Sequence, residues 1–368
     1  MKTNISIFIL LLLILQNCST PLATQAIETE VKHSKIFYKN NGYTAIDILY
    51  ATDRKKEQKP TEDLEDFYTG LRGDLQYGVA VVTIPHTHTF GEMERPIKYF
   101  ESENLHKHIT VQDIEVLSKQ DFLQILKSKL SNVTENDILI FIHGFNNTFA
   151  DAIRRTAQLT YDLKFKGVPL TYSWPSNGKG IDSYMQDEAS VQYTTPHLVT
   201  FFSEVIKNKG DANIHIIAHS MGNRALTNAL KELSFIYPNQ KLFKNVILAA
   251  PDVDQDVFKV SLLPYIKKTT EMITLYASSD DKALKLSSTL HNGMRLGQSD
   301  NIFVFQGLNT IDASGIDTSA LGHSYFAEKE IIVKDLKEVI LKSLPPQQRK
   351  QTLVKKTKND FIYWKIKD

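Results

Sequence analysis

The sequence predicts an α/β fold, a doubly wound and mostly parallel sheet with helices on both faces. Two observations support this prediction. From about residue 119 onwards, apolar β-type segments alternate with segments of helical period. The β-type segments are also continuous apolar runs, such as DILIFI at 137–142 and IHIIAH at 214–219. Strands of this kind are typical of a parallel sheet that is buried on both sides.

The core elements follow in order from residue 119. Strands are expected at six apolar runs. They are DILIFIHG from residue 137, VPLTYSW from 168, IHIIAHS from 214, KNVILAAP from 244, MITLYAS from 272 and NIFVFQG from 301. Helices are expected between them, of which the longest covers about 184–207 and the last about 327–343.

Residues 37–118 predict a different arrangement. The β-type runs AIDILYA at 45–51 and YGVAVVTI at 77–84 flank a charged segment that contains Pro and Gly. This pattern is typical of antiparallel strands. We therefore expect N-terminal antiparallel strands before the parallel core of 119–345, within one domain over 37–345.

A basic tail, 346–368, is expected after this domain. It holds seven Lys or Arg and two Asp. We expect these charges to lie in solvent at the chain end rather than to bind an anionic surface.

The composition is that of an ordinary globular protein. The chain has 368 residues, of which 42% are hydrophobic, enough for one large core or two smaller ones. The formal net charge is +1, which gives no reason to expect nucleic acid as a partner. The only cysteine is Cys18, so a disulfide within one chain is excluded.

The N-terminus predicts export. An unbroken apolar stretch at 5–15 has the length of a signal-peptide core and is short for a bilayer span. We expect a signal peptide over 1–17, lipid attachment to Cys18 and a polar tether over 18–36, which predicts a membrane-anchored lipoprotein of a bacterial cell envelope that faces the periplasm. An asparagine precedes this cysteine where a small residue is usual. Secretion with cleavage near Ala26 and an uncleaved anchor are therefore the alternatives.

Ser220 lies in A-H-S-M-G, between an apolar strand and a helix. On a parallel sheet, functional groups collect at the carboxyl ends of the strands. A nucleophilic serine there needs a turn so tight that the residues two before and two after it must be small. Ala218 and Gly222 meet this requirement. A serine that merely caps the helix is the alternative.

A second strand end supports the nucleophile. His143, Gly144 and Phe145 follow the strand that begins at residue 137. Acyl transfer needs N–H donors for the oxyanion, one just after the nucleophile and one from an upstream loop. We therefore expect the amides of Met221 and Phe145 to form the oxyanion hole, with His143 bracing the loop. A glycine that only ends the strand is the alternative.

The base must follow both the serine and the acid in the sequence on this scaffold. His291 and His323 are the histidines that follow Ser220. His323 lies beyond the last predicted core strand, where the base is expected, whereas His291 follows a predicted helix. His323 is therefore the preferred catalytic base.

Four aspartates are candidates for the acid. Asp280 and Asp281 follow the MITLYAS strand, and Asp252 and Asp254 follow the KNVILAAP strand. We choose Asp281, and the other three remain open. A helix N-cap is the other explanation for Asp280 and Asp281.

Three further residues stand near these motifs. His86 and His88 are expected to be solvated loop histidines, because a metal site needs more ligands nearby. Trp174 ends a strand next to the site, so it either lines an acyl pocket or packs in the core. No metal and no organic cofactor is expected.

Several spaced motifs occur in one order along the chain. They are LYATDR at 49–54, IPHTHTFGEMERP at 84–96, IFIHGFNN at 140–147, YSWPSNG at 172–178, IIAHSMGN at 216–223, LAAPDVD at 248–254, YASSDDKAL at 276–284 and GHSYF at 322–326. With these motifs the chain resembles a bacterial α/β-hydrolase family of unknown function that carries an A-H-S-M-G elbow. The resemblance implies the α/β-hydrolase fold, Asp281 as the acid and His323 as the base.

These residues predict a serine hydrolase that cleaves a carboxylic ester through an acyl-enzyme. Ser220 attacks the carbonyl, His323 relays the proton and Asp281 orients His323. The alternatives are an acyltransferase or thioesterase with the same triad, and an envelope binding module without activity. The expected partners are a small-molecule ester or lipid, and the membrane through the lipid anchor.

Overall fold

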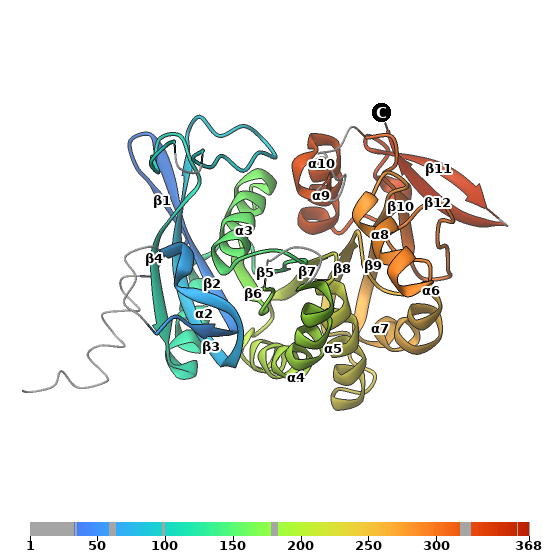
Figure 1. Ribbon diagram of the computed structural model, residues 1–368, viewed down its shortest axis with the longest axis horizontal. Helices are drawn as coiled ribbons and strands as arrows, with labels where there is room; N and C mark the ends of the chain where they lie inside the picture. The colour runs from blue at the N-terminus through green and yellow to red at the C-terminus, as the bar shows by residue number, and fades with distance from the viewer. Residues whose placement is uncertain are drawn as a thin grey trace, which may run out of the picture.

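The computed structural model describes residues 33, 35–58, 64–97, 100–177, 183–316, 325–358 and 360–367. The strands are β1 (Phe37–Lys39), β2 (Tyr43–Lys56), β3 (Tyr68–Pro85), β4 (Thr110–Leu117), β5 (Asp137–Ile142), β6 (Val168–Ser173), β7 (Asn213–His219), β8 (Phe243–Ala249), β9 (Thr270–Ala277), β10 (Asn309–Asp312), β11 (Leu353–Lys358) and β12 (Phe361–Ile366). They form a 12-stranded sheet in the order β11-β12-β10-β9-β8-β7-β5-β6-β2-β3-β4, with β1 paired to β2 (Figure 1).

The centre of the sheet is parallel and its two ends are antiparallel. Each neighbouring pair from β2 through β6, β5, β7, β8, β9 and β10 to β12 is parallel. At one end β1, β2, β3 and β4 pair antiparallel, and at the other end β11 pairs antiparallel with β12. The predicted mostly parallel sheet with N-terminal antiparallel strands is confirmed.

Helices cover both faces of the sheet (Figure 1). They are α2 (Lys119–Asn132), α3 (Phe149–Leu163), α4 (Tyr184–Asn208), α5 (Gly222–Ile236), α6 (Gln255–Val257), α7 (Leu263–Thr269), α8 (Lys282–His291), α9 (Tyr325–Glu328) and α10 (Glu330–Lys342), with short turns η1 (Leu64–Asp66), η3 (Phe258–Leu262) and η4 (Pro346–Gln348). α3 packs with α10 on one face, while α2, α4, α5 and α7 form a row on the other. This is the doubly wound arrangement that the sequence predicts.

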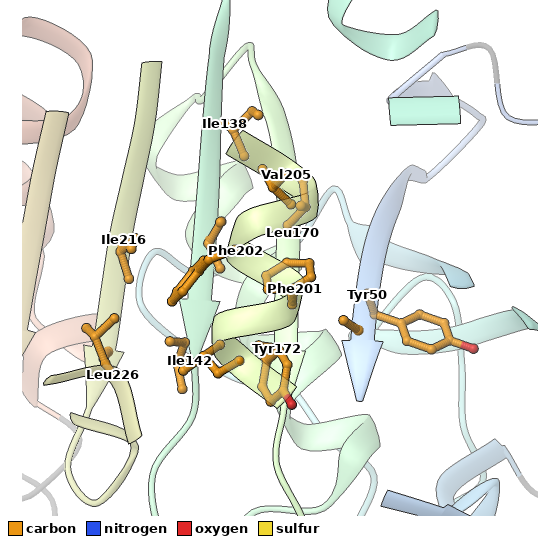
Figure 2. Close-up of a cluster of buried hydrophobic side chains, with 14 of the residues drawn as sticks. Tyr50, Ile138, Ile142, Leu170, Tyr172, Phe201, Phe202, Val205, Ile216 and Leu226 are labelled. Atoms are coloured by element: carbon orange, nitrogen blue, oxygen red, sulfur yellow. The ribbon is translucent and has the colours of Figure 1, made fainter. Parts of the chain in front are cut away.

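Buried side chains of α4 join it to the centre of the sheet. Phe201, Phe202 and Val205 are fully buried within one turn of α4. In Figure 2 they lie beside side chains from β5 and β6, among them Ile138 and Leu170. Burying a side chain of this size contributes roughly 1.5–3 kcal/mol. The central strands, whose carboxyl ends carry Ser220 and the loop after β5, are therefore firmly packed.

The predicted strand at 301–307 is wrong. Its Phe303 and Phe305 are half-buried side by side in a loop, with ring centroids 6.3 Å apart. The strand at this place is β10, the polar segment that follows. Both phenylalanines of this loop pack against the core. Their spacing therefore resembles the apolar pattern of a strand.

The residues expected to form a basic tail continue the sheet instead. β11 and β12 form a hairpin, and β12 pairs with β10 through Trp364 and Lys365. Leu353 and Ile366, at the root of the hairpin, are buried. The strand pattern of β11 is hard to recognise in the sequence, because Lys355 and Lys356 occupy exposed positions of this strand.

The packed structure begins within the segment expected to be a tether. The Nδ1 atom of His33 lies 2.8 Å from Asp47 Oδ2, and the buried Lys129 donates to the same oxygen at 3.0 Å. Cys18 and the predicted signal peptide lie outside the described residues. In the described part of the chain, no helix is long and apolar enough to cross a membrane.

Candidate active site

Ser220 occupies a strained turn at the carboxyl end of β7. The strand ends at His219 and α5 begins at Gly222. Ser220 has a φ of 50°, in the left-handed region that residues with a side chain rarely adopt. Its N–H donates to the carbonyl of Ala249 at 3.0 Å, and its carbonyl accepts from the N–H of Asp252 at 3.2 Å. This is the strand-to-helix geometry of a nucleophile elbow.

The elbow touches the loop after β5 through two glycines. A Cβ atom on Gly222 would lie 2.3 Å from the carbonyl oxygen of His143. A Cβ atom on Gly144 would lie 2.8 Å from the Cβ atom of Ser220. Both distances are too short for non-bonded atoms, so the close approach of the two segments requires glycine at each position.

The peptide N–H groups of Phe145 and Met221 lie in these two segments. Within the described ranges, neither group donates a hydrogen bond. The carbonyls of Gly144 and Phe145 are by contrast occupied, since the side-chain amide of Asn147 donates to them at 3.3 and 2.8 Å. A fixed loop with an available N–H group is suited to stabilise an oxyanion.

Arg54, near the end of β2, holds the loops after β5 and β6 together. Its Nε donates to Ser173 Oγ at 2.9 Å, and its Nη2 donates to the carbonyl of Asn147 at 2.7 Å and to His143 Nε2 at 3.3 Å. Its Nη1 donates to two further backbone carbonyls, so all the donors of the guanidinium are used. Burial lowers the pKa of Arg54 to about 10, which still leaves it charged at neutral pH.

Sequence reasoning did not single out Arg54 as a site residue. The only sequence feature that points to it is its place in LYATDR, at the end of the buried part of β2. The same network includes His143, whose role as a brace for the loop was expected.

His143 is a neutral imidazole that braces the loop. Its Nδ1 donates to the carbonyl of Gly144 at 2.8 Å, and its Nε2 accepts from Arg54. Burial, assisted by the positive charge of Arg54, lowers the pKa of His143 to about 3. Trp174 is fully buried, stacks on this ring at 5.2 Å and donates to the His143 carbonyl at 2.7 Å. Trp174 therefore packs in the core and does not line an acyl pocket.

Asp280 and Asp281 follow β9 but differ in their surroundings. Asp281 is fully buried, and its Oδ1 caps α8 by accepting from the N–H of Leu284 at 2.9 Å. Asp280 is exposed and accepts from the N–H of Gly315 at 2.7 Å. Shielding from water suits a carboxylate that orients a catalytic imidazole, and of these two residues Asp281 has it.

Asp252 and Asp254 have other partners. Asp252 accepts from the hydroxyl of Tyr184, from Ser287 at 2.7 Å and from Arg224 at 3.1 Å. Burial opposes the charge of Asp252, but Arg224 and the hydroxyl donors outweigh burial and lower its pKa. Asp254 caps α6. Both carboxylates therefore fix the segment after β8.

His291 is engaged at both ring nitrogens. Its Nε2 lies 2.6 Å from Glu188 Oε1, and its Nδ1 lies 2.8 Å from the carbonyl of Ser287. The other candidate base, His323, lies outside the described residues. The chain is described again from α9, which begins two residues after His323.

The short helix α9 packs against the elbow and α3. Phe326 stacks on His219, the residue before the candidate nucleophile, with ring centroids 4.5 Å apart. Gln158, on α3, donates to the carbonyl of Ala327 at 3.2 Å. Helix α9 is therefore fixed beside the elbow.

The loop of the IPHTHTFGEMERP motif also contacts α9. A Cβ atom on Gly91 would lie 2.4 Å from the carbonyl oxygen of Glu328. The side chain of Glu328 is in turn held by Arg155 at 3.3 Å. Sequence reasoning gave this loop no role near the site, and the structure shows that it packs against the helix after His323.

The prediction of solvated loop histidines is correct for His86, which is exposed, and wrong for His88. The ring of His88 lies between Glu94 at 2.8 Å and Asp162 at 3.0 Å. Burial opposes its charge, but the hydrogen bonds with Asp162 and Glu94 outweigh burial and raise the pKa of His88 to about 9. Asp162 also accepts from the N–H of Gly91 at 2.9 Å, so this ion pair shapes the loop.

A cavity of about 530 Å³ lies between α4, α5 and the segment after β8. Arg224, on the first turn of α5, lines it together with Gln192 and Pro196 of α4 and Val257. Among the residues that the structure describes, no group of three His, Cys, Asp or Glu side chains is placed to hold a metal ion.

Comparison with known proteins gives a family match. A family model described as an alpha/beta hydrolase of unknown function matches residues 98–341. This confirms the resemblance, and the matched range includes Ser220 and Asp281. An uncharacterized protein of Nostoc sp. (strain PCC 7120) is 39% identical over 62 residues, which are 17% of this chain and 16% of that protein. The chain thus matches a small part of the length of that relative.

Comparison with solved structures finds several that are similar over part of the chain at low sequence identity. MenH from S. aureus is 16% identical, with 57% of this chain and 94% of that chain covered and a TM-score of 0.32. A zinc-bound, cold-adapted esterase from an Arctic intertidal metagenomic library is 10% identical, with 82% and 96% covered and a TM-score of 0.38. Carboxylesterase CesB (YbfK) from Bacillus subtilis is 13% identical, with 57% and 85% covered and a TM-score of 0.30.

Proposed function

The chain belongs to the family of α/β-hydrolases of unknown function, and we propose that it is a serine hydrolase that cleaves carboxylic esters. Ser220 Oγ attacks the ester carbonyl while His323 accepts its proton, and Asp281 orients His323. The N–H groups of Phe145 and Met221 stabilise the tetrahedral oxyanion. His323 then protonates the leaving alcohol and activates the water that releases the acid from the acyl-enzyme.

The observation that carries this proposal is the left-handed backbone of Ser220. A serine that caps a helix adopts an extended backbone and accepts from an N–H group of the first turn. Ser220 has a φ of 50°, and the residue at the N-cap of α5 is Met221, which makes no side-chain cap. A backbone strained in this way costs of order 1–3 kcal/mol and is typical of functional sites. The helix-cap alternative does not account for this geometry.

The surroundings of Asp281 support its role as the acid. It follows β9, and β9 pairs with β10, after which the base is expected. Asp252 is bound to Arg224, and Asp254 caps a helix. His291 is engaged at both ring nitrogens, which favours His323 as the base.

Labelling and kinetics test the nucleophile. A fluorophosphonate probe should modify the wild-type chain at Ser220, and the chain should hydrolyse members of a panel of esters of graded acyl length. Ser220→Ala should abolish labelling and lower kcat by about 10⁶-fold. Ser234→Ala, which removes another buried hydroxyl on α5, should behave like wild type. Equal turnover by Ser220→Ala and wild type on every ester would remove the assignment.

We further propose that the protein is exported and anchored to a membrane of the bacterial envelope through Cys18, facing the periplasm, where a small-molecule ester or lipid is the substrate. The apolar stretch at 5–15 and the LQNC motif support this proposal. Cys18→Ala should release the protein from membranes washed at high salt, a condition that weakens electrostatic binding but not a lipid anchor, and mass spectrometry of wild type should find a lipid-modified peptide at Cys18. Unchanged membrane retention of the variant, with no modified peptide in wild type, would contradict the anchor.

A further inference from the structure

The hairpin of β11 and β12 extends beyond the sheet that carries it (Figure 1). The two strands pair with each other along their whole length. β12 pairs with β10 through Trp364 and Lys365, near its C-terminal end. Within the described ranges, the half of the hairpin next to its turn therefore has no strand partner outside the hairpin.

Apolar side chains on this hairpin are left exposed. Val354 is 41% exposed, Phe361 48% and Ile362 46%. Phe361 and Ile362 are consecutive in β12, so they point to opposite faces of the hairpin. Lysines on an edge strand are explained by protection against edge-to-edge pairing, but exposed Phe and Ile are not. Exposed apolar groups of this kind indicate a contact surface.

The same segment is strongly basic. Residues 346–367 contain seven Lys or Arg and one acidic residue, Asp360. Lys355 and Lys356 are exposed on β11 and form no ion pair with any described residue. Lys358, by contrast, donates to the side chain of Asn301 at 2.7 Å. Lys355 and Lys356 are therefore available to an anionic partner.

We propose that this hairpin docks on a lipid bilayer with anionic headgroups. The turn of the hairpin enters first, so Phe361 and Ile362, which lie beside the turn on opposite faces, both reach the boundary between headgroups and acyl chains. Lys355 and Lys356 are farther from the turn and lie at the level of the phosphates. Each of these lysines lies opposite an aromatic residue of β12. Tyrosine and tryptophan are enriched at this depth of a membrane because their rings are apolar and their polar atoms remain hydrated.

A nucleic acid is the other anionic polymer that a basic hairpin can bind. Stacking on bases requires aromatic faces, whereas two of the three exposed apolar residues, Val354 and Ile362, are aliphatic. The formal net charge of the whole chain is only +1, so it lacks the excess of positive charge typical of nucleic-acid binders. The exposed side chains therefore fit a lipid surface better.

Vesicle binding tests this proposal without the lipid anchor. A chain that lacks residues 1–18 loses Cys18 and the apolar stretch but keeps every described residue. Its thermal unfolding is first compared with that of the full chain, to verify that it folds. We expect sedimentation with vesicles of phosphatidylcholine and phosphatidylglycerol, little with pure phosphatidylcholine, and loss of binding as salt rises.

The charge of the hairpin is tested by Lys355→Gln combined with Lys356→Gln. This double variant should lower the vesicle partition coefficient about 25-fold, because each lysine near an anionic surface contributes roughly fivefold. The control is Lys127→Gln combined with Lys207→Gln, which removes two exposed lysines from α2 and α4. It has the same net charge as the hairpin variant and should bind like wild type.

The apolar contact is tested by Phe361→Thr combined with Ile362→Thr, which keeps residues that favour strands. It should lower the partition coefficient about tenfold, because less apolar surface enters the bilayer. Tryptophan fluorescence gives a second measurement. Trp174 is fully buried in the core, so a shift of emission on adding anionic vesicles reports on Trp364.

The proposal is overturned if the wild-type chain does not bind anionic vesicles, or if both hairpin variants bind them like wild type. Binding to a double-stranded oligonucleotide that depends on the hairpin, without vesicle binding, overturns it in favour of nucleic acid. Ser220→Ala should bind vesicles like wild type, since the inference does not rest on the proposed ester hydrolysis. Failure of one proposal therefore leaves the other intact.

Discussion

The two sides of the proposed active site are built in different ways. On the nucleophile side, Arg54 ties the end of β6 and the loops after β5 and β6 to β2 through four hydrogen bonds, and Trp174 packs behind His143. On the acid side, Asp281 caps α8 after β9. The chain after His323 is α9, a helix of 4 residues that packs on other elements through a few side chains.

This difference separates a part of the site that a buried polar network holds from a part that fewer described side-chain contacts hold. An oxyanion hole is effective when its donors do not move as charge develops, and the network around Arg54 provides this rigidity. A catalytic base takes a proton from the serine and gives it to the leaving group, so it changes partners during each cycle. We expect substitutions on the nucleophile side to lower stability and activity together, and substitutions on the acid side to lower activity first.

After Ser220→Ala, the largest effect on kcat is expected on the acid side, from Asp281→Asn. Asparagine caps a helix about as well as aspartate, so the free energy of unfolding should change by less than about 1 kcal/mol. The kcat for ester hydrolysis should nevertheless fall about 10⁴-fold, because the imidazole loses the carboxylate that orients it. Asp280→Asn is the control and should stay near wild type. A larger loss of kcat in Asp252→Asn, with the fold intact, would move the acid to Asp252.

The nucleophile side is tested by Arg54→Met, which leaves several buried acceptors without a donor. Removing one member of a buried polar network costs about 3–5 kcal/mol, and denaturation by urea should show this loss. Arg72→Met, which removes an exposed guanidinium, should cost less than about 1 kcal/mol. Equal unfolding midpoints for the two variants would show that the network does not hold the loops.

The support of α9 is tested by Gly91→Ala. Gly91 has a φ of 82°, and its Cβ would lie 2.4 Å from the Glu328 carbonyl oxygen. Gly210 also has a positive φ, of 57°, but nothing lies within 4 Å of the added atom. Gly210→Ala therefore introduces backbone strain without a steric clash. We expect Gly91→Ala to cost about 2 kcal/mol of stability and Gly210→Ala about 1 kcal/mol. Only Gly91→Ala should also lower kcat, about tenfold, through misplaced geometry. Equal kcat values would show that the loop does not support the site.

The smallest effect is a pH dependence of stability that arises from His88, in the loop at 86–96 after β3. The pKa of His88 is raised to about 9 in the folded chain, so its charge stabilises the fold fully below its unfolded pKa of about 6.5, and this contribution is lost as the pH rises through about 9. The free energy of unfolding should fall by about 1 kcal/mol over this range, after allowance for screening by solvent. His88→Gln should lack this decrease, and His86→Gln should keep it. Denaturation at a series of pH values measures both, and an unchanged slope in His88→Gln would show that another group titrates.

The parallel core could be predicted from the sequence because its strands are buried on both faces. β5 and β7 are nearly continuous runs of buried, mostly apolar residues. Such runs can be recognised in the sequence without knowledge of the strands that pair with them. The edges could not be predicted in this way. β4 (Thr110–Leu117) mixes buried and exposed positions, and β10 consists of NTID, whose place in the sheet depends on its neighbours β9 and β12.

The residues of the candidate site also differ in how well the sequence predicts them. Ser220 and its small neighbours could be predicted because a tight turn restricts residue type at fixed spacing. The role of Arg54 could not, because three of its acceptors are backbone carbonyls, which leave no trace in residue identity. The burial of His88 could not be predicted either, because its partner Asp162 lies 74 residues away on α3. Trp174 remained undecided because its residue type fits both a pocket and a core.

A methyl group at Gly144 or Gly222 would collide with the opposite segment. Neither position can therefore accept a larger residue unless the other segment moves at the same time. The cavity beside α5 is free of this restriction, because neither glycine is among its lining residues and side chains such as Gln192 and Val257 line it. Related proteins should accordingly diverge in the lining of this cavity while the paired glycines change together or not at all.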